Sequence, residues 1–267
     1  MIEQRSDEWR LARAGKLTAS CFVDIISMTK GGKPTAERSK LMRKLAFERL
    51  AGIPAHEIGG KALNWGTEVE GPAVQTYELI TGNIVKESEF LRHPRYDFIG
   101  SSPDGLVGAE GGIEIKSPHD EGVHINTWLS GMPEEHMAQV QGNMFVTGRQ
   151  WWDFISYDPR QCERLRLYVQ RIPRDDKFIS DMAAALLQFE AELQQMIAEL
   201  ERKSAYGRSM DILDRLETAN EYCESSEARQ LRKDSAEEIR ALRRQVSELE
   251  ALLRRRSSQK MARGVMA

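Results

Sequence analysis

The sequence predicts a mixed α/β domain, in which helices pack on a central sheet, followed by a helical extension. Segments 18–27, 37–51 and 61–81 have the apolar spacing of helices. Short strand-like segments separated by turn residues follow them. The chain then returns to a helix, two strands and a long amphipathic helix at 174–203. This succession is typical of the α+β or mixed α/β class.

Local signals justify the individual elements. Thr18 is suited to cap the helix at 18–27, because its hydroxyl can accept a hydrogen bond from a free backbone N–H. The stretch "GGKPT" at 31–35 interrupts the helical pattern, since glycine and proline disfavour helix. The remaining predicted elements are strands at 84–94, 97–102 and 111–118, a helix at 133–147, and strands at 151–158 and 164–172. Turn residues between the first three strands predict a meander.

The pattern changes near residue 205. We therefore expect a domain at 1–203 and a helical tail at 204–267, joined by "SAYGRSM" at 204–210. Beyond the joint, apolar residues recur at alternating spacings of three and four, which is typical of a coiled-coil seam. These residues are Ile239, Leu242, Val246, Leu249 and Leu253. A helix docked on its own domain would show the same short seam, so both interpretations stay open.

The composition excludes several classes of protein. The 267 residues carry a formal net charge of −3, so a DNA-binding surface would have to be local. The three cysteines (Cys21, Cys162 and Cys223) form no CxxC pair, which argues against a zinc site and a disulfide framework. The first residues lack the apolar core of a signal peptide, and no apolar run approaches the length of a membrane span. We expect a cytoplasmic protein that does not associate with membranes.

Three charged residues lie beside apolar strand residues, where charge is costly. Glu114 and Lys116 are two residues apart on a strand and share a face, while Ile113 and Ile115 face the core. Asp104 lies in the preceding turn, and a hairpin can bring it beside Glu114. Two converging carboxylates repel one another unless a hard cation such as Mg²⁺ lies between them. A neighbouring lysine can align or deprotonate a water molecule, or stabilise negative charge on a phosphate.

The spacing of these residues matches the PD-(D/E)xK pattern of metal-dependent nucleases. Pro103 and Asp104 supply the first two positions, and "EIK" at 114–116 supplies the rest. Aspartate, glutamate and lysine are common, so the pattern also fits a surface hairpin with a solvated Glu–Lys pair. The flanking sequence has to decide between the two interpretations.

Six blocks in a fixed order include and surround this pattern. The first is "EWRLARAGKLTAS" (8–20), which contains the series W-x3-R-x-G-x-L-T-A-S. The others are "ALNWGTEVEGPAV" (62–74), "SPDGL" (102–106), "IEIKSP" (113–118), "MAQVQGNMFVTG" (137–148) and "YDPR" (157–160). Together these blocks resemble the lambda exonuclease family, also called the YqaJ-like viral recombinases. The resemblance covers roughly residues 5–175, and the tail beyond 205 has no counterpart in it.

The resemblance implies a restriction-endonuclease-like core of the PD-(D/E)xK type. It also implies a 5′-to-3′ exonuclease that acts on double-stranded DNA ends with Mg²⁺, for which Mn²⁺ is an alternative. Such an enzyme releases 5′-mononucleotides and leaves a 3′ overhang. The family further implies a homotrimeric ring that threads DNA, and a single-strand annealing protein that uses the overhang in phage-type recombination.

The resemblance assigns the charged cluster to catalysis. Asp104 and Glu114 correspond to metal ligands, and the carbonyl of Ile115 to a third ligand. Lys116 corresponds to the catalytic lysine.

Four more residues have counterparts in the family. Glu70 matches an acidic residue that a helix contributes to the metal site; helical periodicity alone does not choose between Glu70 and Glu68. Gln139 matches the glutamine that helps to position the attacking water. Arg13 and Ser20 match the pocket for the 5′-phosphate, in keeping with bidentate guanidinium chemistry and a hydroxyl near a helix start.

Two other functions stay open. A related PD-(D/E)xK nuclease with endonuclease or 3′-directed activity would lack the 5′-phosphate pocket. A non-catalytic DNA-binding assembly protein on the same fold would be expected to have lost Asp104, Glu114 or Lys116, all of which are present.

Overall fold

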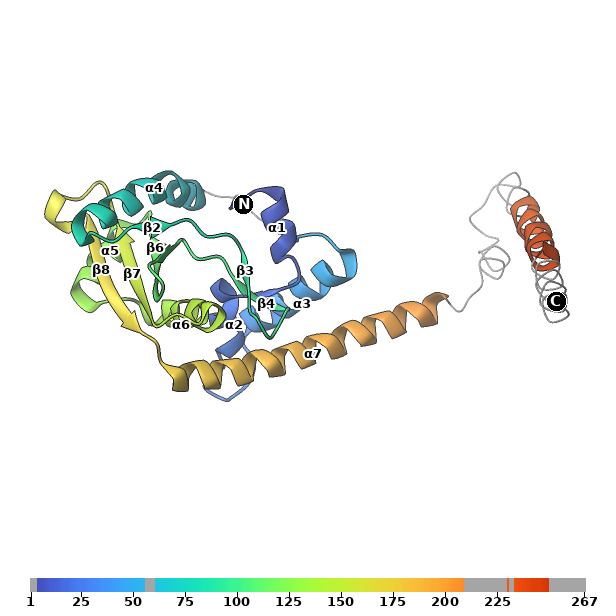
Figure 1. The fold of residues 1–267 in the computed structure, drawn as a ribbon. Coiled ribbons are helices and arrows are strands. Elements are labelled where there is room, and N and C mark those ends of the chain that lie inside the picture. Colours follow the sequence, from blue (N-terminus) through green and yellow to red (C-terminus); the bar gives the residue numbers. More distant parts are fainter. Residues whose placement is uncertain (1–3, 56–60, 209–229, 231–232, 250–267) are drawn as a thin grey trace, which may run out of the picture. The chain divides into compact units, whose positions relative to one another are not determined.

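The computed structural model describes residues 4–55, 61–208, 230 and 233–249. The chain forms two compact units, Met1–Ile197 and Ala198–Ala267, and each is described by itself. Every described strand lies in the first unit (Figure 1).

A five-stranded mixed sheet forms the centre of the first unit. Its order is β2 (Val85–Lys86), β5 (Gly105–Val107), β6 (Gly111–Lys116), β7 (Trp151–Tyr157) and β8 (Leu167–Pro173). β6 and β7 run parallel, and the other neighbours are antiparallel. The mixed α/β class predicted from the sequence is confirmed.

A second, three-stranded sheet has the order β1 (Leu17–Thr18), β4 (Ile99–Ser101) and β3 (Leu91–Arg92). The predicted strand at 84–94 was wrong, because this segment does not form one continuous strand. This segment supplies β2 to the large sheet and β3 to the small one. The polar residues 87–89 break the apolar alternation between the two strands, so the ladder is interrupted there.

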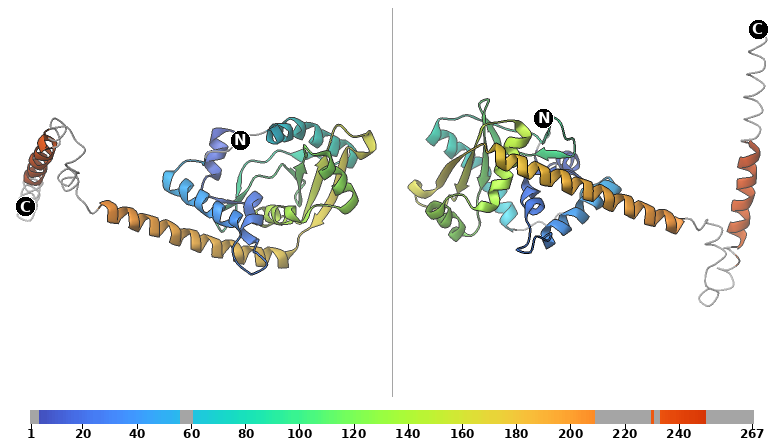
Figure 2. Two further views of the ribbon diagram at one scale, coloured as in Figure 1. Left: turned by 180° about the vertical axis from the view of Figure 1, so that it is seen from behind. Right: turned by 90° about the horizontal axis from the view of Figure 1, so that it is seen from below.

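Helices cover both faces of the large sheet, as Figures 1 and 2 show. The helices of the first unit are α1 (Asp7–Arg13), α2 (Phe22–Ile26), α3 (Ala36–Ala51), α4 (Lys61–Thr81), α5 (Glu121–Ser130), α6 (Met137–Thr147) and the first part of α7 (Asp176–Arg208), with 3₁₀ turns at η1 (Ala19–Cys21), η2 (Glu134–His136) and η3 (Glu163–Leu165). Apolar residues of α4 pack with Ile113 and Ile155 on one face. Apolar residues of α2, α3, α6 and α7 pack with Trp152 and Phe154 on the other. None of the described helices is both long and apolar enough to cross a membrane.

The first half of α7 packs against the helices on one face of the large sheet. Its buried residues recur at spacings of three and four, as expected for an amphipathic helix. They are Ile179, Met182, Leu186, Phe189 and Leu193. Ion pairs of Arg49 with Glu190, at 2.7 Å, and of Arg38 with Glu192, at 2.8 Å, tie α3 to the same helix.

The predicted helix at 18–27 begins later than expected. Leu17 and Thr18 pair with β4 as a parallel strand, and the α-helix starts at Phe22. Thr18 caps nothing through its side chain. Its hydroxyl lies 3.3 Å from that of Ser20 instead. This arrangement brings Ser20 into the short turn between β1 and α2, close to the large sheet.

A close approach between α6 and this turn depends on Gly142. A Cβ atom at this position would lie 2.5 Å from the ring of Phe22, too near for any side chain. Gly142 therefore lets α6 pack directly on the N-terminal segment, and α6 is the helix that faces the charged residues of β6.

The second unit contains a helix over residues 233–249, in which Leu242, Val246 and Leu249 are exposed. Leu253, the last residue of the predicted seam, lies outside the described residues. The coiled coil therefore stays a prediction. Within the predicted joint, residues 204–208 continue α7 as helix, and 209–210 lie outside the described residues.

Candidate active site

The hairpin of β5 and β6 brings Asp104 beside the charged residues of β6. Asp104 directly precedes β5, and Gly105 is paired with Ile113. The Asp104 carboxylate accepts a hydrogen bond of 2.6 Å from the backbone N–H of Ile115. The hairpin thus brings Asp104 beside the strand that carries Glu114 and Lys116.

Glu114 is the centre of a hydrogen-bond network between β6 and α6. It is only 2% exposed and accepts from Lys116 Nζ at 2.7 Å, Gln139 Nε2 at 2.6 Å and Asn143 Nδ2 at 3.0 Å. Gln139 and Asn143 lie one helical turn apart on α6, so they reach the same carboxylate. The three donors hold this buried carboxylate in one orientation.

Lys116 is held in place by the same network. Its ammonium group also donates to Gln139 Oε1 at 3.1 Å, so the Gln139 amide links lysine and carboxylate. Burial alone would lower the pKa of Lys116, but the charges of Glu114 and Asp104 outweigh burial and raise it. The lysine is therefore a cation at neutral pH, suited to stabilise negative charge rather than to accept a proton.

Three carboxylates share this part of the site. The pKa of Asp104 is raised well above its usual value by desolvation and by the charges of Glu114 and Glu70. These oxygens, with the carbonyl of Ile115, are the hard ligands that Mg²⁺ or Mn²⁺ prefers, and a divalent cation would relieve their mutual repulsion. The donor set thus fits such an ion.

Metal binding would nevertheless require some rearrangement of these ligands. Within the described residues, no three acidic, histidine or cysteine side chains already form a cluster that could enclose an ion. Both oxygens of Glu114 accept hydrogen bonds, and Glu70 turns toward Arg5.

Arg5 forms an ion pair of 2.6 Å with Glu70 on α4. Among the described residues, Arg5 is the one non-glycine residue with a positive φ, at 69°. Its neighbour Gln4 fixes the segment by donating to the carbonyls of Ser88 at 3.2 Å and Pro103 at 2.9 Å. The N-terminal segment is thus anchored beside Asp104, with a guanidinium directed at one of the carboxylates.

A separate group of polar residues surrounds Arg13 of α1. The Arg13 guanidinium donates to Ser102 Oγ at 2.7 Å and to Ser20 Oγ at 3.5 Å. Its carbon lies 4.1 Å from the ring centroid of Trp9, a cation–π contact that fixes the plane of the guanidinium. Two hydroxyls on one guanidinium make an arrangement that can bind a phosphate group.

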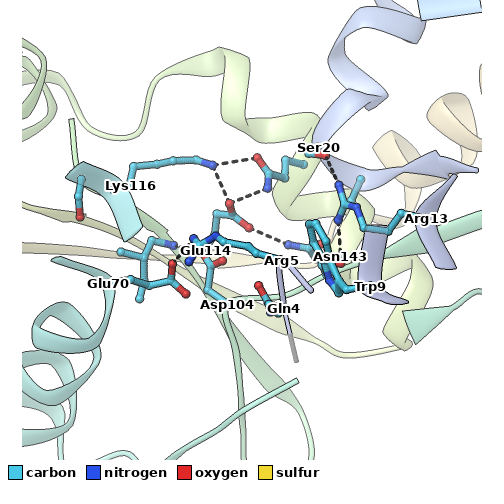
Figure 3. A pocket seen from close by; sticks show the side chains of 16 residues that line it. Gln4, Arg5, Trp9, Arg13, Ser20, Glu70, Asp104, Glu114, Lys116 and Asn143 are labelled. Carbon is cyan, nitrogen blue, oxygen red and sulfur yellow. Dashed lines mark hydrogen bonds and ion pairs between the residues drawn. The ribbon is translucent and has the colours of Figure 1, made fainter. Parts of the chain in front are cut away.

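Both groups line one cavity of about 340 Å³. Figure 3 shows the carboxylates and Lys116 toward one side and Trp9, Arg13 and Ser20 toward the other. All eight residues predicted from the sequence contribute to its walls: Arg13, Ser20, Glu70, Asp104, Glu114, Ile115, Lys116 and Gln139. Glu70 lines the cavity, and Glu68 does not.

Sequence reasoning missed several residues of the site. Asn143 could have been found, because it follows Gln139 by one helical turn. Ser102 could also have been found, because it lies two residues before Asp104 in the same turn. Arg5 and Trp9 gave no such signal, since their approach to the cavity depends on how the N-terminal segment packs.

The chain is similar to known proteins in both sequence and structure. Residues 8–150 match the family described as the YqaJ-like viral recombinase domain. Among curated proteins, the uncharacterized protein YqaJ of Bacillus subtilis (strain 168) is 24% identical over 189 residues. That match covers 70% of this chain and 56% of the relative, so this chain spans little more than half of the relative's length.

Solved structures resemble the chain more extensively. An alkaline exonuclease (LHK-Exo) from Laribacter hongkongensis is 42% identical, with a TM-score of 0.69, and the match covers 75% of this chain and 99% of that one. The same protein in complex with dAMP gives a TM-score of 0.70. A phage related exonuclease from Haemophilus somnus 129PT, at 21% identity and a TM-score of 0.54, covers 69% of this chain and 96% of its own, and shares the fold.

Proposed function

The chain belongs to the family of YqaJ-like viral recombinase domains, and from this membership and its site we propose that it is a nuclease that degrades double-stranded DNA from 5′ ends. It would require Mg²⁺, with Mn²⁺ as an alternative, release 5′-mononucleotides and leave a 3′ single-stranded overhang. One observation carries the proposal. The carboxylate–lysine group around Glu114 and the guanidinium–hydroxyl group around Arg13 line the same cavity.

The two groups would bind two successive phosphates of one strand. Arg13, Ser20 and Ser102 would hold the 5′-terminal phosphate through charge-assisted hydrogen bonds. The next phosphate would then lie at the carboxylate end of the cavity, where its bond to O3′ of the first nucleotide breaks. A water molecule would add its oxygen to phosphorus, and the products would be a 5′-mononucleotide and a DNA strand with a new 5′-phosphate.

The proposed roles of the acidic residues follow from their chemistry. Asp104, Glu114, Glu70 and the carbonyl of Ile115 would hold the metal ion, which when bound supplies Lewis-acid stabilisation and lowers the pKa of water. Lys116, as a cation, would stabilise the charge that develops on the phosphate oxygens. Gln139, which is hydrogen-bonded to both Lys116 and Glu114, would hold these two side chains in place and orient the attacking water.

The alternatives are an endonuclease, a 3′-directed nuclease and a non-catalytic DNA-binding protein on this fold. The Arg13 group supports an enzyme that recognises a 5′-phosphate, because neither alternative nuclease needs it. A protein that had lost its catalytic activity would not be expected to keep the hydrogen-bonded arrangement of Glu114, Lys116 and Gln139.

Three DNA substrates test the proposal: linear duplexes with 5′-phosphate, linear duplexes with 5′-hydroxyl, and closed circles, each with and without Mg²⁺. The proposal predicts degradation of linear DNA with Mg²⁺, faster from 5′-phosphate ends, and intact circles. Nicking of circles would favour an endonuclease, and binding without cleavage would favour the non-catalytic alternative.

We further propose that 1–203 is the nuclease domain and that the tail at 204–267 is an accessory. Partners would be DNA ends, two further copies in a homotrimeric ring and a single-strand annealing protein, all in the cytoplasm. α7 continues to Arg208, so a chain that ends there keeps this helix whole and should still degrade linear DNA.

A further inference from the structure

A second cavity, of about 210 Å³, adjoins the active-site cavity. The two cavities share Trp9, Arg13 and Ser20 as lining residues. We call the second one the basic pocket, because four cationic side chains line it: Arg10, Arg13, Lys16 and Lys44. Its walls come from α1, the segment after it, and α3.

One carboxylate, that of Glu48, also lines the basic pocket. Both oxygens of this carboxylate accept hydrogen bonds from backbone N–H groups, of Gly15 at 2.7 Å and of Ala55 at 3.0 Å. The ammonium of Lys44 lies 3.9 Å from the Glu48 carboxylate, and the Lys44 side chain is 45% exposed. Glu48 contributes one negative charge against four cations, so the lining of the pocket keeps a net positive charge.

Two of the cations have partners outside the pocket walls. Arg10 pairs with Asp7, and Lys16 pairs with Asp97, each at 3.0 Å. The carboxyl side chains are 98% and 74% exposed, respectively. An ion pair with such an exposed carboxylate is weak, so a phosphate in the pocket can compete for Arg10. Lys16 is held more firmly, because its side chain is 17% exposed and also donates to the Asp97 carbonyl at 2.9 Å.

A buried donor adds to these charges. The indole N–H of Trp9 is buried and has no hydrogen-bond partner in the part of the chain that the structure describes. Buried donors are normally paired. The ring lines both cavities, and Arg13 stacks on it. An anion that reached the indole N–H would satisfy this donor.

We propose that the basic pocket binds a second phosphate group of the DNA, on the 5′ side of the phosphate held by Arg13 and Ser20. The inference rests on the proposed function and extends it to DNA with a 5′ overhang. The volume is below the range of ordinary small-molecule pockets, which suits a phosphate group and leaves the attached base outside.

This placement changes the product of the first cleavage. With one overhanging nucleotide, the 5′-terminal phosphate enters the basic pocket and the second phosphate rests on Arg13. The third phosphate then lies at the carboxylates. Water adds to its phosphorus, the bond to O3′ of the second nucleotide breaks, and that oxygen takes a proton. A 5′-phosphorylated dinucleotide leaves. The corresponding first cleavage of a blunt end releases a mononucleotide.

The test compares 5′-phosphorylated duplexes with a blunt end or a one-nucleotide 5′ overhang. The first products of a single turnover with Mg²⁺ are identified by mass spectrometry, and binding of each duplex is measured in EDTA by fluorescence anisotropy. Wild type should release a dinucleotide from the overhang and bind that end more tightly. Lys44→Glu should lower the ratio of overhang to blunt-end affinity by about fivefold, which corresponds to the upper limit for one exposed ion pair.

Arg43→Glu is the matched control, because Arg43 is the exposed neighbour of Lys44 on α3 and lines neither cavity. It should retain the wild-type ratio. Removal of the overhanging nucleotide as a mononucleotide, or an equal effect of both variants, would overturn the basic pocket while leaving the proposed function intact. Failure to cleave blunt 5′-phosphorylated ends would instead overturn the proposed function, and the pocket proposal with it.

Discussion

Asn143 donates a 3.0 Å hydrogen bond from Nδ2 to Oε2 of Glu114, and both side chains are almost completely buried. The other carboxylate oxygen of Glu114 accepts from Lys116 and Gln139. Asn143 is therefore the residue that fixes the rotation of the carboxylate. We assign it a positioning role, since it would act through Glu114 and not on the DNA.

Asn143→Ala should lower turnover by about tenfold, the effect expected when one buried acceptor loses its donor. It should also raise the Mg²⁺ concentration needed for half-maximal rate, because the carboxylate can rotate. Gln141→Ala is the control, since buried Gln141 on the same helix donates to the Pro173 carbonyl, at 2.9 Å, and not to Glu114. An unchanged Mg²⁺ dependence in Asn143→Ala would reduce Asn143 to a structural residue.

Arg5→Gly should make divalent ions bind more tightly. The change removes the guanidinium that pairs with Glu70, and glycine adopts a φ of 69° without strain. In EDTA-treated protein, the Mn²⁺ concentration that gives half-maximal thermal stabilisation should fall by about threefold, as for the loss of one exposed ion pair. Arg5→Lys retains the charge and should stay near wild type. Equal midpoints for the two variants would show that Glu70 takes no part in metal binding.

Lys116→Ala should reduce turnover by about 10²–10³-fold, the usual effect of removing one donor that stabilises a developing negative charge. Lysine as an ammonium has no lone pair with which to bind a metal. Calorimetric binding of Mn²⁺ should therefore be unchanged or tighter, because a competing cation near Glu114 is removed. A large loss of Mn²⁺ affinity would contradict the assigned role.

His136 gives a prediction for stability against pH. Its ring stacks on Phe154 with centroids 5.3 Å apart, and burial, aided by the charge of Lys116, lowers its pKa to about 4. The unfolded chain gains this proton near pH 6.5, whereas the folded chain resists it down to about pH 4. Protonation of His136 in the unfolded chain therefore has no effect on stability well above pH 6.5. It lowers the free energy of unfolding progressively as the pH falls from 6.5 toward 4.

Urea unfolding at pH 7 and pH 5, in EDTA, measures this effect. The free energy of unfolding of wild type should fall by about 2 kcal/mol more than that of His136→Phe, from a slope of roughly 1.4 kcal/mol per pH unit below pH 6.5. Equal losses for the two proteins would show that His136 is protonated as readily in the folded state as in the unfolded state.

The sequence predicted the site better than the boundaries of the fold. Alternation on β6 places Glu114 and Lys116 on one face whatever the details of the sheet, and the hairpin brings Asp104 to them. The N-terminal helix α1 was not predicted, because its seven residues carry no buried side chain and thus no apolar pattern. Its capping serine, Ser6, which accepts from Trp9 N, was the available signal.

Long-range packing explains the remaining differences. Thr18 was predicted as the start of a helix, but Leu17 and Thr18 pair with residues 99 and 100, far along the chain, and form a strand. Arg5 meets Glu70 across 65 residues of sequence, and no local pattern reports such a contact. Asn143 is different, because its helical spacing from Gln139 contains the information that places it in the site.

Digestion of end-labelled duplex DNA shows whether the protein removes nucleotides from 5′ ends. A blunt 5′-phosphorylated duplex, labelled either at a 5′ end or at a 3′ end, is digested with Mg²⁺, and the released label is followed over time. Degradation from 5′ ends should release the 5′ label at once as a mononucleotide, while the 3′ label stays in long single strands. Early release of the 3′ label, or labelled internal fragments of intermediate length, would contradict it.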